Sequence, residues 1–349
     1  MKKIFIHSVS AYNNNIFNEK ERDGYNDPYI YLRDRLLEHG YELITADNND
    51  LKDCDWIFFF DNYGILPYNG LKGSIKKCLT LILNKPVIRD LYSQGCDAGL
   101  VNKMVLFIWE APAVCPSNWN NNLHNRFSHI FTWSEYYSAK PNFHKICWPQ
   151  TRKFPTVPII SYKNKKLLVN ISMNKFSKHK RELYTSRKES IRYFEESFPN
   201  DFDLYGVGWN NDCKRDFYAD KNGNGYFRSY RGLIDNKWEI LPNYKFSLCY
   251  ENIRDEEGFI TEKIFDSMRS NCVPIYWGAP NIGDYVDPKA FIDRREFKSN
   301  KDLATYLINI NENDYNKYLE AINRYLISDK FFEFSPEAFF LKIYSALNL

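Results

Sequence analysis

Short apolar runs alternate with segments of helical periodicity along most of the chain, and this alternation limits the fold more than any other feature. Asp27 and Pro28 begin a helix after the first run, and Gly40 ends it. Apolar strands separated by helices are typical of a parallel sheet that is covered on both faces. The pattern therefore predicts an α/β fold. In the first half of the chain, strands are expected at 3–9, 41–46, 56–61, 85–92, 105–110 and 129–134.

The chain changes character between about 150 and 165, where prolines are frequent and few helix-forming residues occur. A second strand–helix series follows, with strands expected at 166–172, 201–209 and 245–252 and helices near 178–197 and 236–242. A chain of 349 residues is long enough for two domains. We expect an N-terminal domain over 1–155, a second domain over 156–335, and a C-terminal helix over 336–349 that packs on the fold.

The overall composition excludes several classes of protein. The formal net charge of +3 is too small to indicate nucleic-acid binding, and no stretch approaches the about 20 apolar residues of a membrane span. The N-terminal apolar run is too short for a signal peptide. The eight cysteines form no C-x-x-C pair, and the six histidines lack metal-ligand spacing. We expect a cytoplasmic protein that requires no metal, and peripheral contact with the inner face of a membrane stays open.

The stretch FITEKIFDSMRSNCVPIYWGAPNI (259–282) contains the least ordinary charge pattern. Thr261 is placed to cap a helix whose first turn holds Glu262 and Lys263. Free backbone N–H groups and the helix dipole favour anions in a first turn, so a lysine there gains nothing unless an anion is bound. A phosphate is the obvious anion, and the neighbouring glutamate could accept hydrogen bonds from ribose hydroxyls. On local spacing alone, a solvated charge pair explains the pattern as well.

The longer segment FSLCYENIRDEEGFITEKIFDSMRSNCVPIYWGAPNI (246–282) closely resembles the donor-binding motif of glycosyltransferase family 10, the α-1,3/1,4-fucosyltransferases. That motif has an apolar strand ending in Glu-Asn, then an aromatic residue with Val/Ile-Thr-Glu-Lys, a helix, and Val-Pro-aromatic-Trp-Gly-Ala-Pro. The upstream part, 181–209, is similar to bacterial members. The similarity covers about 170 to 290 and is much weaker in the N-terminal half.

The resemblance implies a GT-B fold, in which two Rossmann-like domains face each other across a cleft. It also implies an inverting enzyme that moves fucose from GDP-fucose to a hydroxyl of an oligosaccharide acceptor, with no cofactor beyond the donor. For a bacterial member, the acceptor would belong to a surface polysaccharide such as an O-antigen. The N-terminal domain would face the acceptor and the second domain would bind the donor.

The resemblance also implies roles for five donor-binding residues. Lys263 would contact the diphosphate and Glu262 the ribose. Asn252 would lie in the donor pocket, and Arg187 would be a second cation on the diphosphate, although other basic residues are close to it in the sequence. Phe259 stands where many members have a tyrosine, so it lacks the hydroxyl that could bond the donor. This difference leaves another nucleotide deoxysugar open as the donor.

An inverting transfer also needs a base that takes the proton of the acceptor hydroxyl. Glu110 follows an apolar strand in FIWEAPAVCPSNW (107–119), and the segment is similar to the short Glu-Ser/Ala-Pro segment that carries the family's proposed base. The alternative is a carboxylate at the strand end that caps the following turn. A more distant alternative for the whole chain is a glycan-binding protein without catalytic activity.

Overall fold

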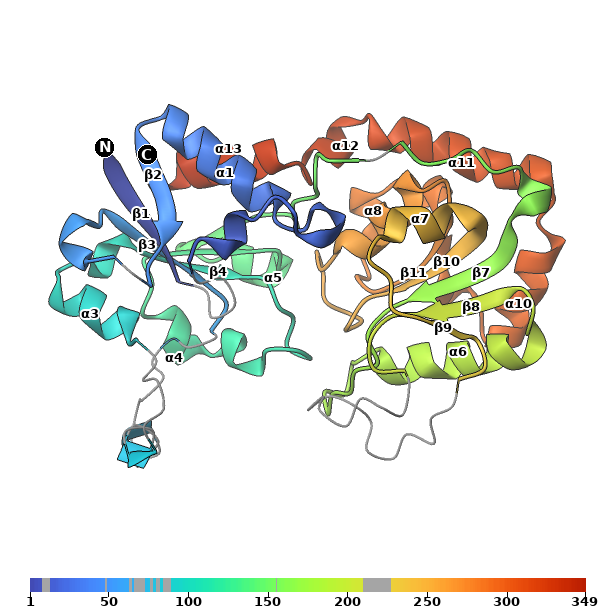
Figure 1. The fold of residues 1–349 in the computed structure, drawn as a ribbon, viewed down its shortest axis with the longest axis horizontal. Coiled ribbons are helices and arrows are strands. Elements are labelled where there is room, and N and C mark those ends of the chain that lie inside the picture. Colours follow the sequence, from blue (N-terminus) through green and yellow to red (C-terminus); the bar gives the residue numbers. More distant parts are fainter. Residues whose placement is uncertain are drawn as a thin grey trace. The chain divides into compact units, whose positions relative to one another are not determined.

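The computed structural model describes residues 1–7, 13–47, 49–62, 65, 73–75, 78–79, 82–83, 89–154, 156–209 and 227–349. Contacts divide the chain into two compact units. Unit 1 consists of Met1–Glu21, Asn26–Pro149 and Pro336–Leu349, and unit 2 consists of Arg22–Tyr25 and Gln150–Ser335. Each unit is built around its own sheet of parallel strands (Figure 1).

The sheet of unit 1 has the order β2-β1-β3-β4-β5-β6, and neighbouring strands pair in parallel. Alternate residues of β3 and β4 enter two different apolar clusters: Phe58 and Phe107 belong to one, and Phe59 and Leu106 to the other. The sheet is therefore buried on both faces, as the apolar runs predict. The strands are β1 (Lys2–His7), β2 (Tyr41–Thr45), β3 (Trp56–Phe60), β4 (Met104–Ile108), β5 (His129–Thr132) and β6 (Phe143–Lys145).

Helices cover both faces of this sheet. The first apolar cluster takes in residues of α1 (Asp27–Glu38) and α13 (Pro336–Leu347), which lie side by side (Figure 1). The second cluster takes in residues of α3 (Leu91–Asp97) and α4 (Asn121–His124). Unit 1 also contains α5 (Glu135–Ser138) and the 3-10 turns Asn15–Phe17, Leu51–Asp53, Val101–Lys103 and Pro116–Trp119.

The sheet of unit 2 has the order β12-β11-β10-β7-β8-β9, again with parallel pairing. Its strands are β7 (Lys166–Ile171), β8 (Phe202–Tyr205), β9 (Tyr230–Gly232), β10 (Tyr244–Tyr250), β11 (Val273–Trp277) and β12 (Ile292–Asp293). Its helices are α6 (Tyr184–Ser197), α7 (Lys237–Ile240), α8 (Glu262–Arg269), α9 (Ile282–Tyr285), α10 (Asn300–Asn309), α11 (Glu312–Leu326) and α12 (Asp329–Phe332). Its 3-10 turns are Arg22–Gly24, Tyr162–Asn164, Leu241–Asn243, Pro288–Ala290 and Arg294–Glu296.

The strand order of unit 2 reverses between β7 and β10. From β7 the chain proceeds to β8 and β9 on one side, whereas from β10 it proceeds to β11 and β12 on the other. Helix α6 follows β7 and helix α8 follows β10 (Figure 1). The two connections that contain these helices therefore run in opposite directions along the sheet. In doubly wound sheets, ligands bind outside the carboxyl ends of the strands at such a reversal. This position in unit 2 is therefore the first place to look for a site.

Most of the predicted elements are confirmed, but two predictions are wrong. A strand was predicted over 85–92, but its last two residues belong to helix α3, which begins at Leu91. Residues 84–88 lie outside the described ranges. The helix predicted from 178 begins only at Tyr184. Backbone hydrogen bonds tie Arg181 and Leu183 to the segment that follows β10, at Arg254 and Asn252, and keep residues 181–183 out of the helix.

The structure also bears on membrane spans, on the state of the cysteines and on metal sites. Within the described part of the chain, no helix combines the length and the apolar character that a membrane crossing requires. Seven of the cysteines lie in the described ranges and are free thiols, and Cys213 lies outside those ranges. No group of three or more His, Cys, Asp or Glu among the described residues is arranged to hold a metal ion.

Candidate functional site

A buried carboxylate organises the carboxyl end of β10. Glu251 directly follows this strand and has no exposed surface. Its carboxylate accepts a hydrogen bond from the backbone N–H of Thr261 at 2.8 Å, and the hydroxyl of Thr261 lies 2.8 and 3.0 Å from the two carboxylate oxygens. The ammonium of Lys263 lies 3.0 Å from the same group. A buried charge is tolerated when it is paired and hydrogen-bonded in this way.

Lys263 is the second residue of α8, so the predicted first-turn position is confirmed. Its ammonium lies 3.0 Å from Glu251 and 3.6 Å from Glu262, and 23% of the side chain is exposed. Burial lowers the pKa of Lys263, but the charges of Glu251 and Glu262 outweigh that effect and the pKa lies above its usual value. Lys263 is therefore a charged group that solvent, or an anion in solution, can reach.

Thr261 does not cap α8 with its side chain, contrary to the expectation from sequence. It occupies the N-cap position, but it makes no side-chain hydrogen bond to the first turn. Its hydroxyl instead contacts Glu251 and accepts a hydrogen bond from the ammonium of Lys263 at 2.7 Å. The residue therefore joins the carboxylate to the lysine.

Glu262 is the first residue of α8, and 37% of its side chain is exposed. Burial raises the pKa of its carboxyl, but the charges of Lys263 and Lys237 lower it, with a net fall from 4.5 to about 2. Lys237 is held by hydrogen bonding to Asp266, one turn further along α8, at 2.6 Å. Glu262 is thus an ionised carboxylate at a helix N-terminus with room to accept further hydrogen bonds.

Arg187 lies in α6 and is only 3% exposed, so the alternative of a solvated helix charge is wrong for this residue. Its Nη2 donates to the carbonyl oxygens of Tyr250 and Glu251, at 2.5 and 3.1 Å. Burial lowers the pKa of Arg187, and the charge of Glu251 raises it. Arg187 and Lys263 both contact Glu251, the arginine at the backbone carbonyl and the lysine at the carboxylate, and the charge of Arg187 lowers the pKa of Lys263.

The other cations near Arg187 in sequence have different surroundings. Arg181 precedes α6 and pairs with Glu256. Arg192 pairs with Glu195 at 2.6 Å and lies over the ring of Phe227. The guanidinium of Arg181 donates to the carbonyl of Asp255, five residues beyond β10, at 2.9 Å, whereas Arg187 donates to the carbonyls at the end of the strand. The structure therefore distinguishes Arg187 from its neighbours, which the sequence alone did not.

The two remaining predicted donor residues lie beside this cluster. Asn252 follows Glu251, and its carbonyl accepts a hydrogen bond from the N–H of Leu183, directly before α6. Phe259 is 1% exposed, and its carbonyl accepts a hydrogen bond from the hydroxyl of Tyr276 at 3.2 Å. All five predicted donor residues therefore belong to the segments around β10, α6 and α8 in unit 2.

Gly278, in the turn after β11, contacts this cluster so closely that a side chain would not fit. A Cβ at this position would lie 2.6 Å from Cγ of Glu251 and 2.5 Å from the hydroxyl oxygen of Tyr276. Contacts below 3.0 Å force a neighbour to move. The glycine therefore lets the turn close against Glu251.

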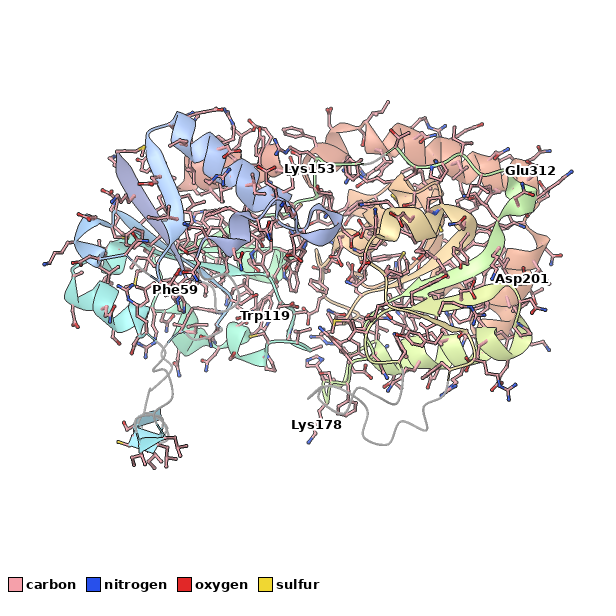
Figure 2. All side chains as sticks on the ribbon, viewed as in Figure 1. Phe59, Trp119, Lys153, Lys178, Asp201 and Glu312 are labelled. Atoms are coloured by element: carbon pink, nitrogen blue, oxygen red, sulfur yellow. The ribbon has the colours of Figure 1, made fainter. Side chains whose placement is uncertain are left out.

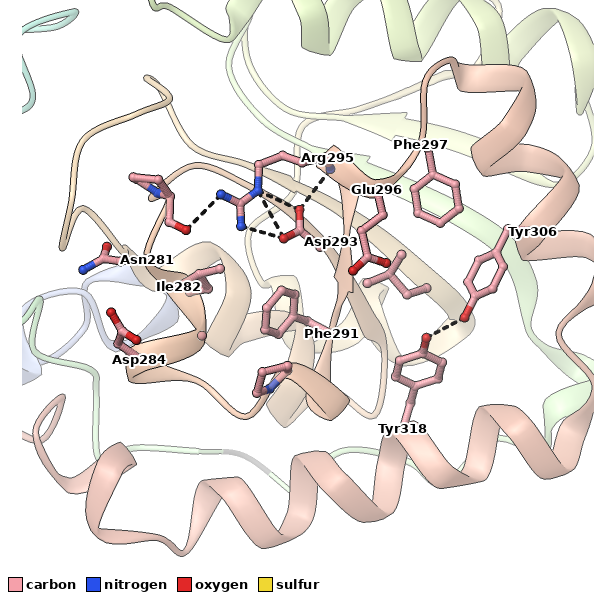
Figure 3. Close-up of a pocket in the computed structure, with 14 residues that line it drawn as sticks. Asn281, Ile282, Asp284, Phe291, Asp293, Arg295, Glu296, Phe297, Tyr306 and Tyr318 are labelled. Atoms are coloured by element: carbon pink, nitrogen blue, oxygen red, sulfur yellow. Dashed lines mark hydrogen bonds and ion pairs between the residues drawn. The ribbon is translucent and has the colours of Figure 1, made fainter.

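A hollow of about 530 Å³ lies on unit 2 between the turn after β11 and helices α10 and α11 (Figure 3). Its main polar groups are already paired. Arg295 bonds Asp293 through two nitrogens and donates to the carbonyl of Pro280, and the hydroxyls of Tyr306 and Tyr318 are 2.7 Å apart. None of the predicted donor residues lines this hollow.

Glu110 belongs to unit 1 and lies two residues beyond the end of β4, as predicted. Its backbone N–H donates to Asp61 Oδ1 at 3.0 Å. Its carbonyl accepts a hydrogen bond from the indole of Trp119 at 3.2 Å; Trp119 is labelled in Figure 2. The carboxylate that accepts the N–H groups of this turn is therefore that of Asp61, a residue that the sequence analysis did not single out.

Two solved glycosyltransferases are similar in structure to this chain. A crystal structure of an α1,3-fucosyltransferase matches with a TM-score of 0.59 at 16% identity, covering 100% of this chain and 90% of that chain. A DNA-modifying β-glucosyltransferase matches with a TM-score of 0.54 at 12% identity, covering 100% of both chains. Together with the two parallel six-stranded sheets, these matches show the GT-B fold of glycosyltransferases, and the predicted fold class is confirmed.

The chain belongs to glycosyltransferase family 10. A family model described as "Glycosyltransferase family 10 (fucosyltransferase) C-term" matches residues 162–339, about half of the chain. An α-(1,3)-fucosyltransferase of Helicobacter pylori is 37% identical over 101 residues, which is 29% of this chain and 21% of that protein. An α-(1,4)-fucosyltransferase of Arabidopsis thaliana is 43% identical over 67 residues, 19% of this chain and 16% of that protein.

The name of a third relative gives protein as the acceptor of fucose. A GDP-fucose protein O-fucosyltransferase 3 of Xenopus laevis is 39% identical over 84 residues, 23% of this chain and 18% of that protein. The matched part of this chain spans only between 16% and 21% of the length of these three relatives. The sequence similarity to these relatives therefore covers only a minor part of each of them.

Proposed function

We propose that this chain is an inverting α-1,3-fucosyltransferase, which moves fucose from GDP-fucose to a hydroxyl of a glycan acceptor in a bacterial surface polysaccharide. The observation that carries the proposal is the meeting of Arg187 and Lys263 at the carboxyl end of β10. A departing nucleoside diphosphate gains negative charge as the glycosidic bond breaks, and fixed cations stabilise that charge.

The two cations have complementary roles in this proposal. The guanidinium of Arg187 is held by two carbonyls through one nitrogen, which leaves its other nitrogens for phosphate oxygens. The ammonium of Lys263 is partly exposed at the N-terminus of α8, where free backbone N–H groups also favour an anion. The diphosphate would therefore meet two charges and a helix end in one place.

The remaining donor contacts follow from the same geometry. Glu262 is ionised and partly exposed, so it can accept hydrogen bonds from two ribose hydroxyls. Asn252 and Phe259 are proposed to complete the donor pocket. The names of the relatives support fucose as the sugar, as does the similarity in fold to an α1,3-fucosyltransferase solved with GDP-fucose.

We assign the removal of the acceptor proton to Glu110 in unit 1. It lies at the carboxyl end of a central strand, where catalytic groups of such sheets are found. The N–H groups of Trp109 and Glu110 both donate to the carboxylate of Asp61, so the backbone at Glu110 is held by another acid. The proposal includes no metal and no cofactor beyond the donor, and it places the reaction in the cytoplasm because the seven cysteines in the described ranges are free thiols.

The function is tested by measuring transfer from GDP-fucose with Lys263→Ala. We expect kcat to fall roughly 100-fold, the effect of removing one donor to a developing negative charge. Lys317→Ala, which changes an exposed lysine on α11, is the matched control and should leave the rate unchanged. Unchanged turnover in Lys263→Ala would contradict the donor assignment.

A panel of sugar nucleotides separates the alternatives for the donor. Thermal shifts with GDP-fucose, other GDP-sugars, UDP-sugars and dTDP-sugars should show the largest stabilisation with GDP-fucose. A larger shift with a UDP- or dTDP-sugar would reject fucose and favour the deoxysugar relative. Glycan binding with neither transfer nor hydrolysis of any nucleotide would favour the non-catalytic glycan-binding protein. Transfer to a peptide instead of a glycan would reject the proposed acceptor.

A further inference from the structure

The two residues that follow β4, Trp109 and Glu110, have all four of their backbone polar groups bonded to side chains. The N–H groups of both residues donate to Asp61 Oδ1, at 2.8 and 3.0 Å. The carbonyl of Trp109 accepts a hydrogen bond from the indole of Trp133 at 2.7 Å. The carbonyl of Glu110 accepts from the indole of Trp119 at 3.2 Å. Side chains therefore hold the backbone of Trp109 and Glu110 in place, although these residues no longer pair with a neighbouring strand.

Asp61 is the centre of this arrangement. It directly follows β3, is 7% exposed, and its own N–H donates to the carbonyl of Phe107 in β4 at 2.8 Å. Its φ of +55° lies in the left-handed region, which residues other than glycine occupy only a few times in a hundred. Burial raises the pKa of Asp61, and its three hydrogen bonds partly offset that effect. A strained, buried carboxylate of this kind persists only where the surroundings hold it.

Asn118 holds Asp61 from the other side. Its side-chain amide donates to Asp61 Oδ1 at 2.7 Å, and its side-chain oxygen accepts from the N–H of Asn62 at 2.7 Å. Asn118 has no exposed surface, and its carbonyl lies 2.6 Å from Nε2 of His124. Asp61 Oδ1 thus receives three donors, and the group that supplies the third is itself fixed.

We propose that Asp61 is a positioning residue, which fixes the direction in which Glu110 leaves β4 and so orients the proposed base towards the acceptor hydroxyl. The inference rests on the proposed function, because it needs Glu110 to be that base. A base must lie within hydrogen-bond reach of the proton that it takes, and a misplacement of about 1 Å can lower a rate roughly 100-fold. Asp61 needs no contact with either substrate for this role.

The experiment compares Asp61→Ala, Asp61→Asn and Asp55→Ala in the full chain. Asp55 is the matched control, since it directly precedes β3 and accepts a hydrogen bond from the N–H of Lys3 at 2.7 Å. For Asp61→Ala we expect kcat to fall roughly 10- to 100-fold with little change in the KM for GDP-fucose. Asp61→Asn keeps an oxygen for the three donors and should recover most of that rate. Asp55→Ala should keep the normal kcat.

Three outcomes would overturn the inference. The first is an Asp61→Ala enzyme with normal kcat. The second is an equal loss in Asp55→Ala, since the effect would then be general destabilisation. The third is an Asp61→Asn enzyme as slow as Asp61→Ala. The asparagine would then keep the hydrogen bonds to residues 109 and 110 without restoring kcat.

Glu110→Gln separates this inference from the proposed function. If Glu110→Gln keeps its full rate, the base assignment fails, and the positioning role fails with it. If Glu110→Gln is slow while Asp61→Ala is not, only the positioning role fails. Asp61→Ala added to Glu110→Gln should cause no further loss of residual transfer, because both changes act through one group. Additive losses would show that Asp61 acts in another way.

Asp61→Ala leaves two backbone N–H groups without their acceptor and could prevent folding. Trp119→Phe is the milder variant, since it removes only the indole bond to the carbonyl of Glu110. We expect it to lower kcat about threefold to tenfold, with the same unchanged KM for the donor. A rise in that KM with a normal kcat would contradict the inference without any variant at Asp61.

Discussion

The carboxylate of Glu251 lies 3.0 Å from the ammonium of Lys263, and it has no exposed surface of its own. A lysine in the first turn of a helix opposes the helix dipole. Glu251 supplies an anion that compensates for this position. The side chain of Lys263 is still 23% exposed, so a diphosphate can approach it from solvent. Lys263 is therefore held in place by one anion and left open to another.

Removing Glu251 should destabilise the protein strongly. Glu251→Ala leaves the ammonium of Lys263 and the N–H of Thr261 without their buried acceptor, and breaking such a pair costs about 3–5 kcal/mol. Urea unfolding monitored by circular dichroism measures the change. Glu320→Ala, at an exposed position of α11, is the control and should change the stability by less than about 0.5 kcal/mol. Equal stabilities of the two variants would show that Glu251 does not anchor the site.

Gly278→Ala should lower both stability and GDP affinity. The new methyl group would lie 2.6 Å from Cγ of Glu251, so the carboxylate that holds Lys263 has to move. Overpacking of this kind costs about 1–3 kcal/mol. Gly283→Ala is the matched control, because the nearest atom to its Cβ is 3.6 Å away. Thermal unfolding and GDP titration by calorimetry test both effects, and a normal GDP affinity in Gly278→Ala would argue against the coupling of Gly278 to Lys263.

The sequence was informative where function depends on contiguous residues. The positions of Glu262 and Lys263 in a first turn, and of Glu110 after a strand, follow from local periodicity and turn residues. The strand predicted at 85–92 was wrong at its end because a short apolar run does not distinguish a strand from a helix. Strands β9 and β12 have only three and two residues, too few for any periodic pattern.

The sequence was uninformative where function depends on pairs that the fold brings together. Asp61 meets Glu110 across 49 residues because β3 and β4 are neighbours in the sheet. Glu251 meets Lys263 because the chain after β10 turns back into α8. Each of these acids follows an apolar strand, and Glu251 also belongs to the Glu-Asn pair of the family motif. Their partners could be named only once the strand order was known.

The stability of the protein should depend on Glu262 in a defined range of pH. Its carboxyl pKa falls from 4.5 to about 2 on folding, so its contribution is complete above about pH 4.5 and is lost as the pH falls to about 2. The difference in melting temperature between the wild type and Glu262→Gln should shrink over that interval. A difference that stays constant from pH 6 to pH 2 would contradict the lowered pKa.

The affinity for GDP should depend on the guanidinium of Arg187 and not on its charge alone. A lysine at this position keeps the charge, but it cannot bond the carbonyls at the end of β10 and also present two nitrogens to a diphosphate. We expect Arg187→Lys to weaken GDP binding at least about tenfold, the factor that corresponds to roughly 1.4 kcal/mol.

Guanosine, which carries no phosphate, should bind the Arg187→Lys variant as it binds the wild type. Arg192→Lys is the matched control on the same helix, because Arg192 pairs with Glu195 and lies over Phe227. Calorimetric titration of the wild type and both variants with GDP and with guanosine gives the six affinities. Equal losses of GDP and guanosine binding in Arg187→Lys would mean that the substitution disturbs the pocket as a whole. A loss confined to GDP places the diphosphate beside Arg187.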